Sequence, residues 1–411
     1  MKTIVMMAWR NLWRNKRRSL VVITSIGIGI LAMVLSAGLM NGMNNQMVEN
    51  TISTSLGHIA IHEKGFQDTM KLEYNFRAKK EMFSAIRNEP AVKSWAPRVK
   101  AQSMLRSSES SRPVMLVGID PHREKTTTKI YDYLLKDGES RFLDGPDDDG
   151  ILLSQALAKK LDVMVGDKLV VMLQDSGNEI VGVGMTVKGL FQTPIDSFDR
   201  MVAYTGILGL QKITGIGENL SEINIVLKNK QDVDRIKRRL IETAGEPGLE
   251  ILSWKDMAPN LVSAIKLFDT MMYIFFSIIF VTVVFSVANT LIMAIMERFH
   301  EIGVMKSIGT RPSWIFSMVL CEAVNLGIVG LVAGLVAGLS LTYLLSVTGI
   351  NLSFWMESMR MFGTGSIIYP AIKAMDIIVA GVIVLCTTVI AAAYPAWKAA
   401  TIKPLEALNY I

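Results

Sequence analysis

The stretch Glu297–Arg311, ERFHEIGVMKSIGTR, is a polar segment between two of the most hydrophobic parts of the chain. An apolar run, Phe268–Met296, precedes it, and a second run, Trp314–Val347, follows it with Glu322 as its only charged residue. Each run is longer than the about 20 apolar residues that a helix needs to cross a bilayer. The polar segment is therefore expected to meet water, and any soluble partner, between two membrane spans.

The polar segment has the pattern of a short amphipathic helix. Ile302, Met305 and Ile308 recur at i, i+3 and i+6, which places them on one face of a helix. Gly309 follows as a helix stop signal. The other faces carry charged side chains, those of Arg298, Glu301 and Lys306. An ordinary basic loop at the membrane surface is the alternative interpretation.

Three parts of the sequence resemble FtsX-like permeases, the family that contains lipoprotein-releasing and macrolide-exporting ABC transporters. The string E-I-G-V-M-K-S-I-G-T at 301–310 resembles the family's cytoplasmic coupling helix, which docks on a separate ATPase. Y-P-A-W-K-A-A…P-L-E-A-L at 394–408 resembles its carboxyl-terminal signature, and the start around Trp9 and Trp13 resembles its amino-terminal elbow. The resemblance implies ATPase coupling for Glu297, Arg298, Glu301, Ile302, Gly303, Met305, Lys306, Ile308 and Gly309.

Composition indicates a chain that is part membrane protein and part exported domain. Half of the 411 residues are hydrophobic and the mean hydropathy is +0.35, yet 19% are charged. We expect an α-helical membrane domain with four transmembrane helices, plus a large α/β extracytoplasmic domain inserted between the first and second helices. The expected segments are an elbow helix (1–18), first span (19–43), exported domain (44–267), second span (268–296), coupling helix (297–311), third span (314–347), outer loop (348–375), fourth span (376–396) and tail (397–411).

Charge predicts the orientation in the membrane, because Lys and Arg near span ends stay cytoplasmic. The first 18 residues contain no acid and a cluster of bases: Lys2, Arg10, Arg14, Lys16, Arg17 and Arg18. With four spans, both termini are then expected in the cytoplasm and the large domain in the periplasm or outside the cell, as for a multi-pass inner-membrane protein. The net charge of +6 comes mainly from this end, so it does not indicate a nucleic-acid partner.

The exported domain is expected to mix helices and strands. A helix at 79–88 and a hairpin of strands 94–105 and 114–119 precede a mostly β insertion at about 140–219. Within the insertion, Ser154 is the expected cap of a helix at 155–161, and Gly166-Asp167 the turn into a strand. A β-α-β unit over 222–254 is expected to pair with the strands of 57–119.

The sequence lacks three motifs that would indicate nucleotide binding or catalysis. No G-x-x-x-x-G-K-[ST] loop, serine elbow or Cys–His pattern occurs, so we expect no catalytic site and no cofactor on this chain, with ATP and Mg²⁺ held by the partner ATPase. His58 and His62 share a strand face without a third ligand, which favours solvent-facing residues over a zinc site. Asp147–Asp149 lacks the spacing of a calcium loop and is expected to be a solvated turn.

Methionines form a stripe along the first span and beyond it. Thioethers adapt to irregular apolar partners, so the stripe is either a path for acyl chains or simple packing between spans. The candidate path consists of Met33, Met40, Met43, Met47, Met271, Met272 and Phe275. Within the third span, Glu322 is expected to reach water or a basic partner rather than to bind substrate or carry protons, and Asn325 is a second polar residue there.

Overall length and the segment MNGM at 40–43 most resemble the lipoprotein-releasing permeases. The resemblance implies a permease subunit that works in membrane lipid with two copies of a cytoplasmic ABC ATPase and a second permease, as a homodimer or a paralogous heterodimer. Its expected task is to extract lipoproteins from the inner membrane for a periplasmic carrier. Efflux of a peptide, antibiotic or lipid is one alternative, and regulation of a cell-wall hydrolase is another.

Overall fold

Four long apolar helices dominate one part of the structure, a computed structural model that describes residues 2–403. They are α2 (Lys16–Thr51), α11 (Pro259–Glu297), α13 (Pro312–Thr348) and α15 (Ala374–Thr401), and each is long and apolar enough to cross a membrane. Two shorter helices, α1 (Lys2–Arg14) and α12 (Phe299–Ser307), accompany them. The P-L-E-A-L motif at 404–408 lies outside the described residues.

The chain forms two compact units. The helical unit consists of Met1–Asn44, Ile265–Asn351 and Ile367–Ile411, and the α/β unit of Asn45–Ala264 and Leu352–Ser366. The expected fold class is confirmed: four apolar helices, with a large α/β domain between the first helix and the rest.

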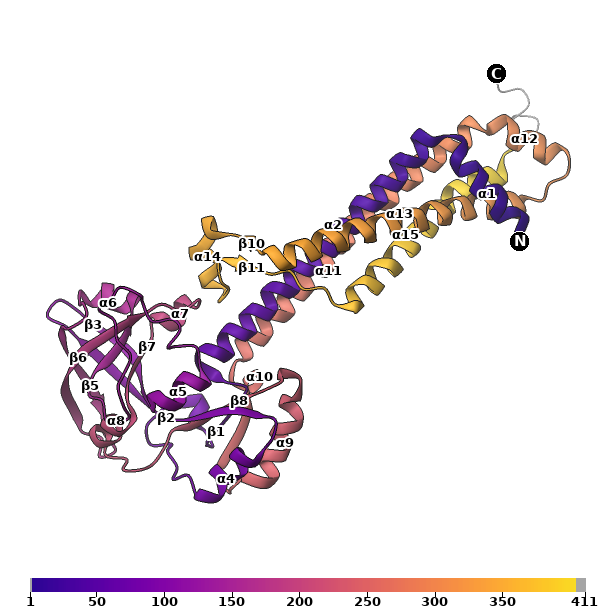
Figure 1. Cartoon of the computed structure of the whole chain (residues 1–411). Helices are drawn as coiled ribbons and strands as arrows, with labels where there is room; N and C mark the ends of the chain where they lie inside the picture. The colour runs from indigo at the N-terminus through magenta and orange to yellow at the C-terminus, as the bar shows by residue number, and fades with distance from the viewer. Residues whose placement is uncertain (1, 404–411) are drawn as a thin grey trace. The chain divides into compact units, whose positions relative to one another are not determined.

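Inside the helical unit, apolar side chains from all four long helices meet. Figure 1 shows α2 and α11 running side by side, and their contact is made by residues such as Val22, Ile30, Val283 and Val287. A glycine in α13 lets α13 approach α2 closely. A Cβ built on Gly334 of α13 would lie 2.8 Å from the carbonyl oxygen of Gly27 in α2, so only glycine fits there.

The α/β unit is built on one nine-stranded sheet in the order β3-β7-β4-β6-β5-β2-β8-β1-β9. Because β2 also pairs with β3, the strands β3, β7, β4, β6, β5 and β2 close into a ring. The strands β8, β1 and β9 extend from β2 as an open sheet. The strands are β1 (Ile59–Glu63), β2 (Val92–Arg106), β3 (Ser111–Ile119), β4 (Ile151–Ser154), β5 (Lys168–Gln174), β6 (Ile180–Phe191), β7 (Val202–Gly206), β8 (Glu222–Leu227) and β9 (Leu249–Ser253).

Helices of the α/β unit are short, and most lie between strands. They are α3 (Phe66–Thr69), α4 (Lys80–Asn88), α5 (Pro121–Thr127), α6 (Gln155–Leu161), α7 (Asp196–Asp199), α8 (Ile207–Thr214), α9 (Val233–Ala244), α10 (Trp254–Met257) and α14 (Met356–Met361). A π-helical turn, Ile52–Leu56, continues α2, and a two-stranded pairing of Ile350–Asn351 (β10) with Ile367–Ile368 (β11) flanks α14 on both sides in the sequence.

Several local predictions hold in the α/β unit. The β2–β3 hairpin is present, with Arg106 paired to Ser111 at its tip. The Ser154 hydroxyl accepts the Leu157 N–H at 3.0 Å and caps α6, and Gly166 has a φ of +93°, which explains why glycine stands at that turn. β8 pairs with β1 and β2, as expected.

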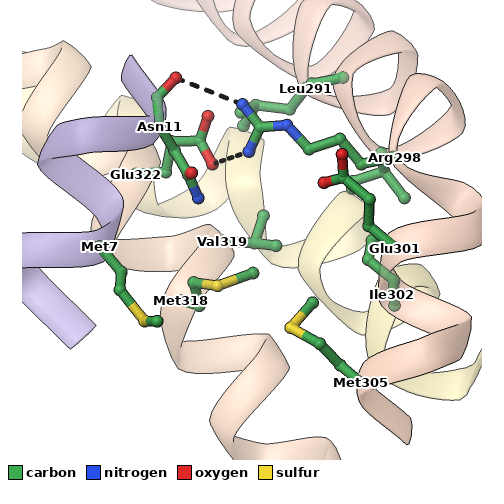
Figure 2. Close-up of a pocket in the computed structure, with 12 residues that line it drawn as sticks. Met7, Asn11, Leu291, Arg298, Glu301, Ile302, Met305, Met318, Val319 and Glu322 are labelled. Atoms are coloured by element: carbon green, nitrogen blue, oxygen red, sulfur yellow. Dashed lines mark hydrogen bonds and ion pairs between the residues drawn. The ribbon is translucent and has the colours of Figure 1, made fainter. Parts of the chain in front are cut away.

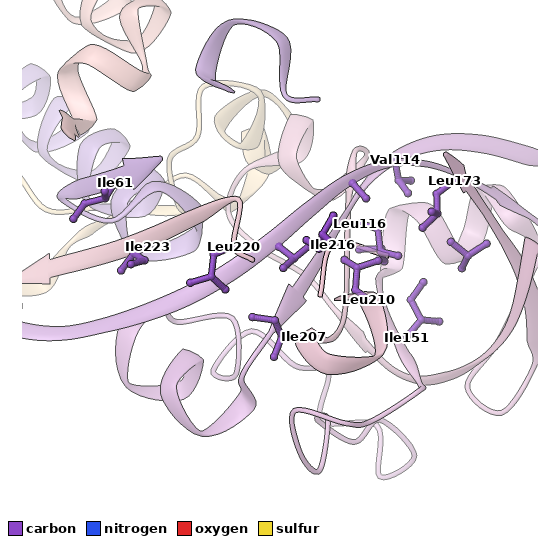
Figure 3. Close-up of a cluster of buried hydrophobic side chains, with 14 of the residues drawn as sticks. Ile61, Val114, Leu116, Ile151, Leu173, Ile207, Leu210, Ile216, Leu220 and Ile223 are labelled. Carbon is purple, nitrogen blue, oxygen red and sulfur yellow. The ribbon is translucent and has the colours of Figure 1, made fainter. Parts of the chain in front are cut away.

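One expectation for this unit was wrong. His58 and His62 are buried rather than solvent-facing, because β1 lies between β8 and β9 and is covered on both faces; His62 Nδ1 lies 3.2 Å from Glu250 Oε1. Residues 140–219 contain the strands β4 to β7 and the helices α6, α7 and α8. Their strands complete the ring with β2 and β3, and Figure 3 shows one continuous core from Ile61 to Leu173.

One acid of the GPDDDG turn is also buried rather than solvated. Asp148 accepts hydrogen bonds from the N–H groups of Asp144 and Gly150, and its carboxylate lies 2.6 Å from Lys188 Nζ. Burial alone would raise the pKa of Asp148, but these hydrogen bonds and the Lys188 charge hold it below its ordinary value. Among the described residues, no group of three His, Cys, Asp or Glu side chains could hold a metal ion.

Candidate functional site

The predicted coupling helix exists as α12, and it packs on its own chain. Ile302 is 2% exposed and lies in an apolar cluster with Ile315 of α13 and Ala396 and Ala399 of α15, while Met305 packs against the same cluster. Ile302, to which the resemblance assigned a role in ATPase coupling, is therefore already covered by helices of its own chain. Ile308, at 81% exposed, and Glu301 remain on the surface.

The carboxyl end of α12 is fixed by Lys306 and Gly309. Lys306 Nζ donates hydrogen bonds to the carbonyl oxygens of Ala400, at 2.8 Å, and Ile402, at 2.6 Å. The last carbonyls of α15 have no partners within their helix, so a lysine charge there both satisfies them and complements the helix dipole. Gly309 has a φ of +95°, as its predicted role as a helix stop requires.

The amino end of α12 is fixed by buried charges. Arg298 lies 3.2 Å from the carboxylate of Glu322 in α13 and donates to the carbonyl oxygen of Asn11 in α1 at 3.3 Å (Figure 2). Glu322 is 5% exposed and has a second cation, Arg18 of α2, at 3.7 Å. Arg18 also pairs with Glu297 at 2.8 Å. The expectation that Glu322 reaches a basic partner is confirmed.

One more ion pair, on the surface, joins α1 to α12. Arg14 Nη2 lies 2.7 Å from Glu301 Oε1, and both side chains are about half exposed (54% and 52%). Beneath this pair is a cavity of about 170 Å³ whose lining is mostly apolar, and Met7, Ile302, Met305 and Met318 contribute to it (Figure 2). Together these contacts join α12 to α1, α13 and α15 and, through Glu322, to α2.

The remaining predicted residues of the coupling segment differ in exposure. Gly303 is buried beside Ile302, whereas Glu297, Ile308 and Gly309 are exposed. Sequence reasoning did not identify Arg18 and Asn11 as contacts of this segment. The acid-free basic cluster of residues 1–18 was the available signal, because a buried acid in the third span needs a nearby cation.

The methionine stripe is partly core. Met33, at 1% exposed, packs with Met272 of α11 and Ala380 of α15, and Met40 packs against the same cluster. Met43 is half-buried and Met47 is buried. Met271 and Phe275 were expected to face the stripe, but they are 51% and 44% exposed, because Met272 and Phe276, four residues apart, take the inner face of α11. Asn325, also in the third span, has no hydrogen-bond partner for its buried Nδ2 within the described residues.

A second buried charge cluster, which was not predicted from the sequence, lies in the α/β unit. Arg98 is 1% exposed, pairs with Glu124 at 2.6 Å and Glu222 at 3.1 Å, and donates to the carbonyl oxygen of Ser55 in the π-helical turn. Lys100 Nζ lies 2.6 Å from Glu222. Although burial alone would raise the pKa of Glu222, the charges of Lys100 and Arg98 hold it below its ordinary value. The end of the α2 helix is thus bonded to the core of the sheet.

Comparison with known proteins agrees with this architecture. The model of the MacB-like periplasmic core domain matches residues 19–243, and that of the FtsX-like permease C-terminal region matches residues 273–404. The chain belongs to the FtsX-like permease family of the MacB and Lol type. The second match contains α12, α13 and α15, so these helices of the candidate site lie inside a region that defines the family, whereas Asn11, Arg14 and Arg18 precede both matches.

Proteins similar to this FtsX-like permease are named for different functions. It is 25% identical to the lipoprotein-releasing system transmembrane protein LolC of Xylella fastidiosa over 97% of this chain and 96% of that protein. It is 23% identical to the pyoverdine export ATP-binding/permease protein PvdT of Pseudomonas syringae over 98% of this chain and 58% of that protein. The periplasmic region of MacB from Actinobacillus actinomycetemcomitans matches 53% of the chain at a TM-score of 0.36 and 14% identity, covering 97% of that structure.

Proposed function

We propose that this FtsX-like permease is the membrane subunit of an ABC transporter that extracts lipoproteins from the inner membrane and releases them to a periplasmic carrier. The observation that carries the proposal is the similarity to the lipoprotein-releasing protein LolC, which extends over 97% of this chain and 96% of that protein. Two copies of a cytoplasmic ATPase supply the energy by binding and hydrolysing ATP with Mg²⁺. A second permease, identical or paralogous, completes the membrane part.

The contacts of α12 support a mechanical role. The helix is held at both ends, by Arg298 with Glu322 and by Lys306 with the end of α15. A force applied by the ATPase to the exposed Glu301 and Ile308 therefore passes to α13 and α15 and, through Arg298 and Arg18, to α2. The chain itself hydrolyses no ATP under this proposal, and both termini and α12 lie in the cytoplasm.

The coupling role is tested by reversing the charge at the exposed position, Glu301→Lys. Mismatched charge at an interface costs several kcal/mol, so ATPase copurification or permease-stimulated ATP turnover should fall markedly. Arg14→Ala is the matched variant, because it breaks the Arg14–Glu301 pair without placing a cation at the contact, and Glu109→Lys makes the same reversal at an exposed position of the α/β unit. Normal turnover in Glu301→Lys would show that α12 does not dock as proposed.

The substrate is tested with the permease and its ATPase in proteoliposomes that hold a lipid-anchored protein. ATP-dependent release should occur for the acylated protein and not for the same protein lacking its acyl chains. The relative named for pyoverdine export favours a second candidate, export of a small amphiphile by the same machinery. ATP turnover stimulated by a small amphiphile, with no release of the lipoprotein, would select that candidate.

A further inference from the structure

Large apolar side chains gather on the surface of the segment between α13 and α15. Phe354 is 90% exposed and Met361 77% exposed, and Trp355 and Met356 are about half exposed. The rings of Phe354 and Trp355 meet edge to face, 5.4 Å apart. We name these four residues the 354–361 patch. An exposed apolar group of this size, so close together in the chain, usually marks a contact with another molecule or with a membrane.

The patch is held firmly from behind. Arg360 of α14 pairs with the buried carboxylate of Asp199 at 2.6 Å and donates to the carbonyl oxygen of Thr193 at 3.1 Å. Asn50 donates to the carbonyl oxygen of Gly363 at 2.9 Å. The backbone of the segment is therefore fixed to the α/β unit by polar contacts, while its apolar side chains are left on the outside.

Chain length limits how far the patch lies from a membrane span. Phe354 follows Thr348, the last residue of α13, by six residues, and six residues reach at most about 21 Å. Apolar exposure continues along the end of that helix, where Tyr343, Leu344 and Val347 are each more than half exposed. The patch thus stays near the outer end of a membrane-spanning helix whatever the position of the α/β unit.

We propose that the 354–361 patch inserts into the headgroup region of the outer leaflet of the inner membrane, beside the end of α13. Tryptophan is enriched at membrane interfaces, and an interfacial helix buries its apolar face about 5–10 Å into the headgroup and acyl boundary. Glu357 is exposed on the same short helix, so anionic lipid is not the attraction and apolar burial drives the contact. The occupant is the lipid surface and not a second protein.

The test uses the full chain in nanodiscs of phosphatidylethanolamine and phosphatidylglycerol. Cys321 and Cys386, the chain's two cysteines, are replaced by alanine, and Phe354→Cys carries an environment-sensitive nitrobenzoxadiazole probe. Met164→Cys is the control, because Met164 is 73% exposed in the same unit and lies in the loop between α6 and β5, far away in sequence. Met361→Cys is a second probe position in case Phe354→Cys perturbs the fold.

Nitroxide lipids labelled at the headgroup or just below it should quench the probe at 354 about threefold more than the probe at 164, and a water-soluble quencher should act less at 354, since insertion is shallow. The quenching should depend little on salt concentration. Equal quenching at both positions would overturn the proposal. So would a probe at 354 that is shielded from water but insensitive to nitroxide lipid, because protein would then cover the patch.

Discussion

Glu322 shows how a single charged residue can be retained within an apolar helix. Its carboxylate is buried between Arg18 of α2 and Arg298, the residue just before α12, and both residues precede α13 in the chain. Each cation is itself almost fully covered, so the three charges depend on one another. Removing one partner of a buried pair leaves an uncompensated charge, which is far more costly than losing an exposed pair.

Glu322→Ala is therefore expected to destabilise the helical unit by about 3–5 kcal/mol, because two buried guanidinium groups lose their shared anion. Glu301→Ala is the control, since it removes the half-exposed pair with Arg14 and should cost about 0–1 kcal/mol. Both are measured as shifts in the thermal unfolding of the purified chain in detergent. Equal shifts for the two variants would contradict the structural role assigned to Glu322.

Asp199, which pairs with Arg360 of α14, has a raised pKa, so the stability of the fold is expected to depend on pH. Burial raises the pKa of Asp199 to about 6, even though Thr193 and Arg360 favour the carboxylate. Because the pKa is higher in the folded than in the unfolded chain, this group contributes stability that is present below about pH 4 and lost as pH rises through 6, to a total of about 3 kcal/mol. The unfolding temperature of the wild type should fall relative to that of Asp199→Asn as pH rises from about 4 to 6. A difference between the two temperatures that stays constant with pH would refute the assignment.

Among the elements, the packing of α13 on α2 depends on the absence of side chains. Gly330, Gly334 and Gly338 lie on one face of α13 and are buried against α2. Lipid supplies no hydrophobic force between helices, so close backbone approach is what makes the contact favourable. A methyl group at Gly334 would meet the Gly27 carbonyl oxygen and Ile30 Cβ, both at 2.8 Å.

Gly334→Ala should therefore push α13 away from α2 and destabilise the helical unit by about 1–3 kcal/mol. Gly381→Ala in α15 is the matched control, because a Cβ there has no atom within 4 Å and helix propensity alone should stabilise by about 0.5–1 kcal/mol. The two variants should shift the unfolding temperature in opposite directions. A stabilising effect of Gly334→Ala would show that the two helices are not in close contact.

Elements with local signals were predictable from the sequence, and the missed features depend on contacts distant in the chain. Long apolar runs, the cap at Ser154 and the turn at Gly166 are encoded by neighbouring residues. Burial of His62 depends on β8 and β9, which follow it by about 160 residues or more. Burial of Ile302 depends likewise on α15, which is distant in the sequence. The apolar face of a short helix therefore did not reveal whether its own chain or a partner covers it.

At the scale of the whole molecule, two helices pass from one unit into the other without a break. α2 has 36 residues, about 54 Å at 1.5 Å per residue, which is longer than the roughly 30 Å of bilayer hydrocarbon. Its π-helical continuation is bonded to the sheet through Arg98, Glu124 and Glu222. If motion at α12 reaches the α/β unit through the chain, a stiff α2 is the means, because a flexible joint would absorb the displacement.

Asn45 is the place to interrupt this path, because it is exposed and lies at the boundary between the two units. Proline inside a helix removes one backbone hydrogen bond and clashes with the preceding turn, so Asn45→Pro should kink or loosen α2. Allosteric coupling is commonly worth 5–150-fold, and we expect substrate release per ATP hydrolysed to fall about tenfold, while ATPase binding and turnover remain near normal. Asn45→Ala keeps the helix and should behave as wild type. Copurified ATPase, ATP turnover and release are measured on the same preparation, and undiminished release by Asn45→Pro would mean that α2 does not transmit the motion.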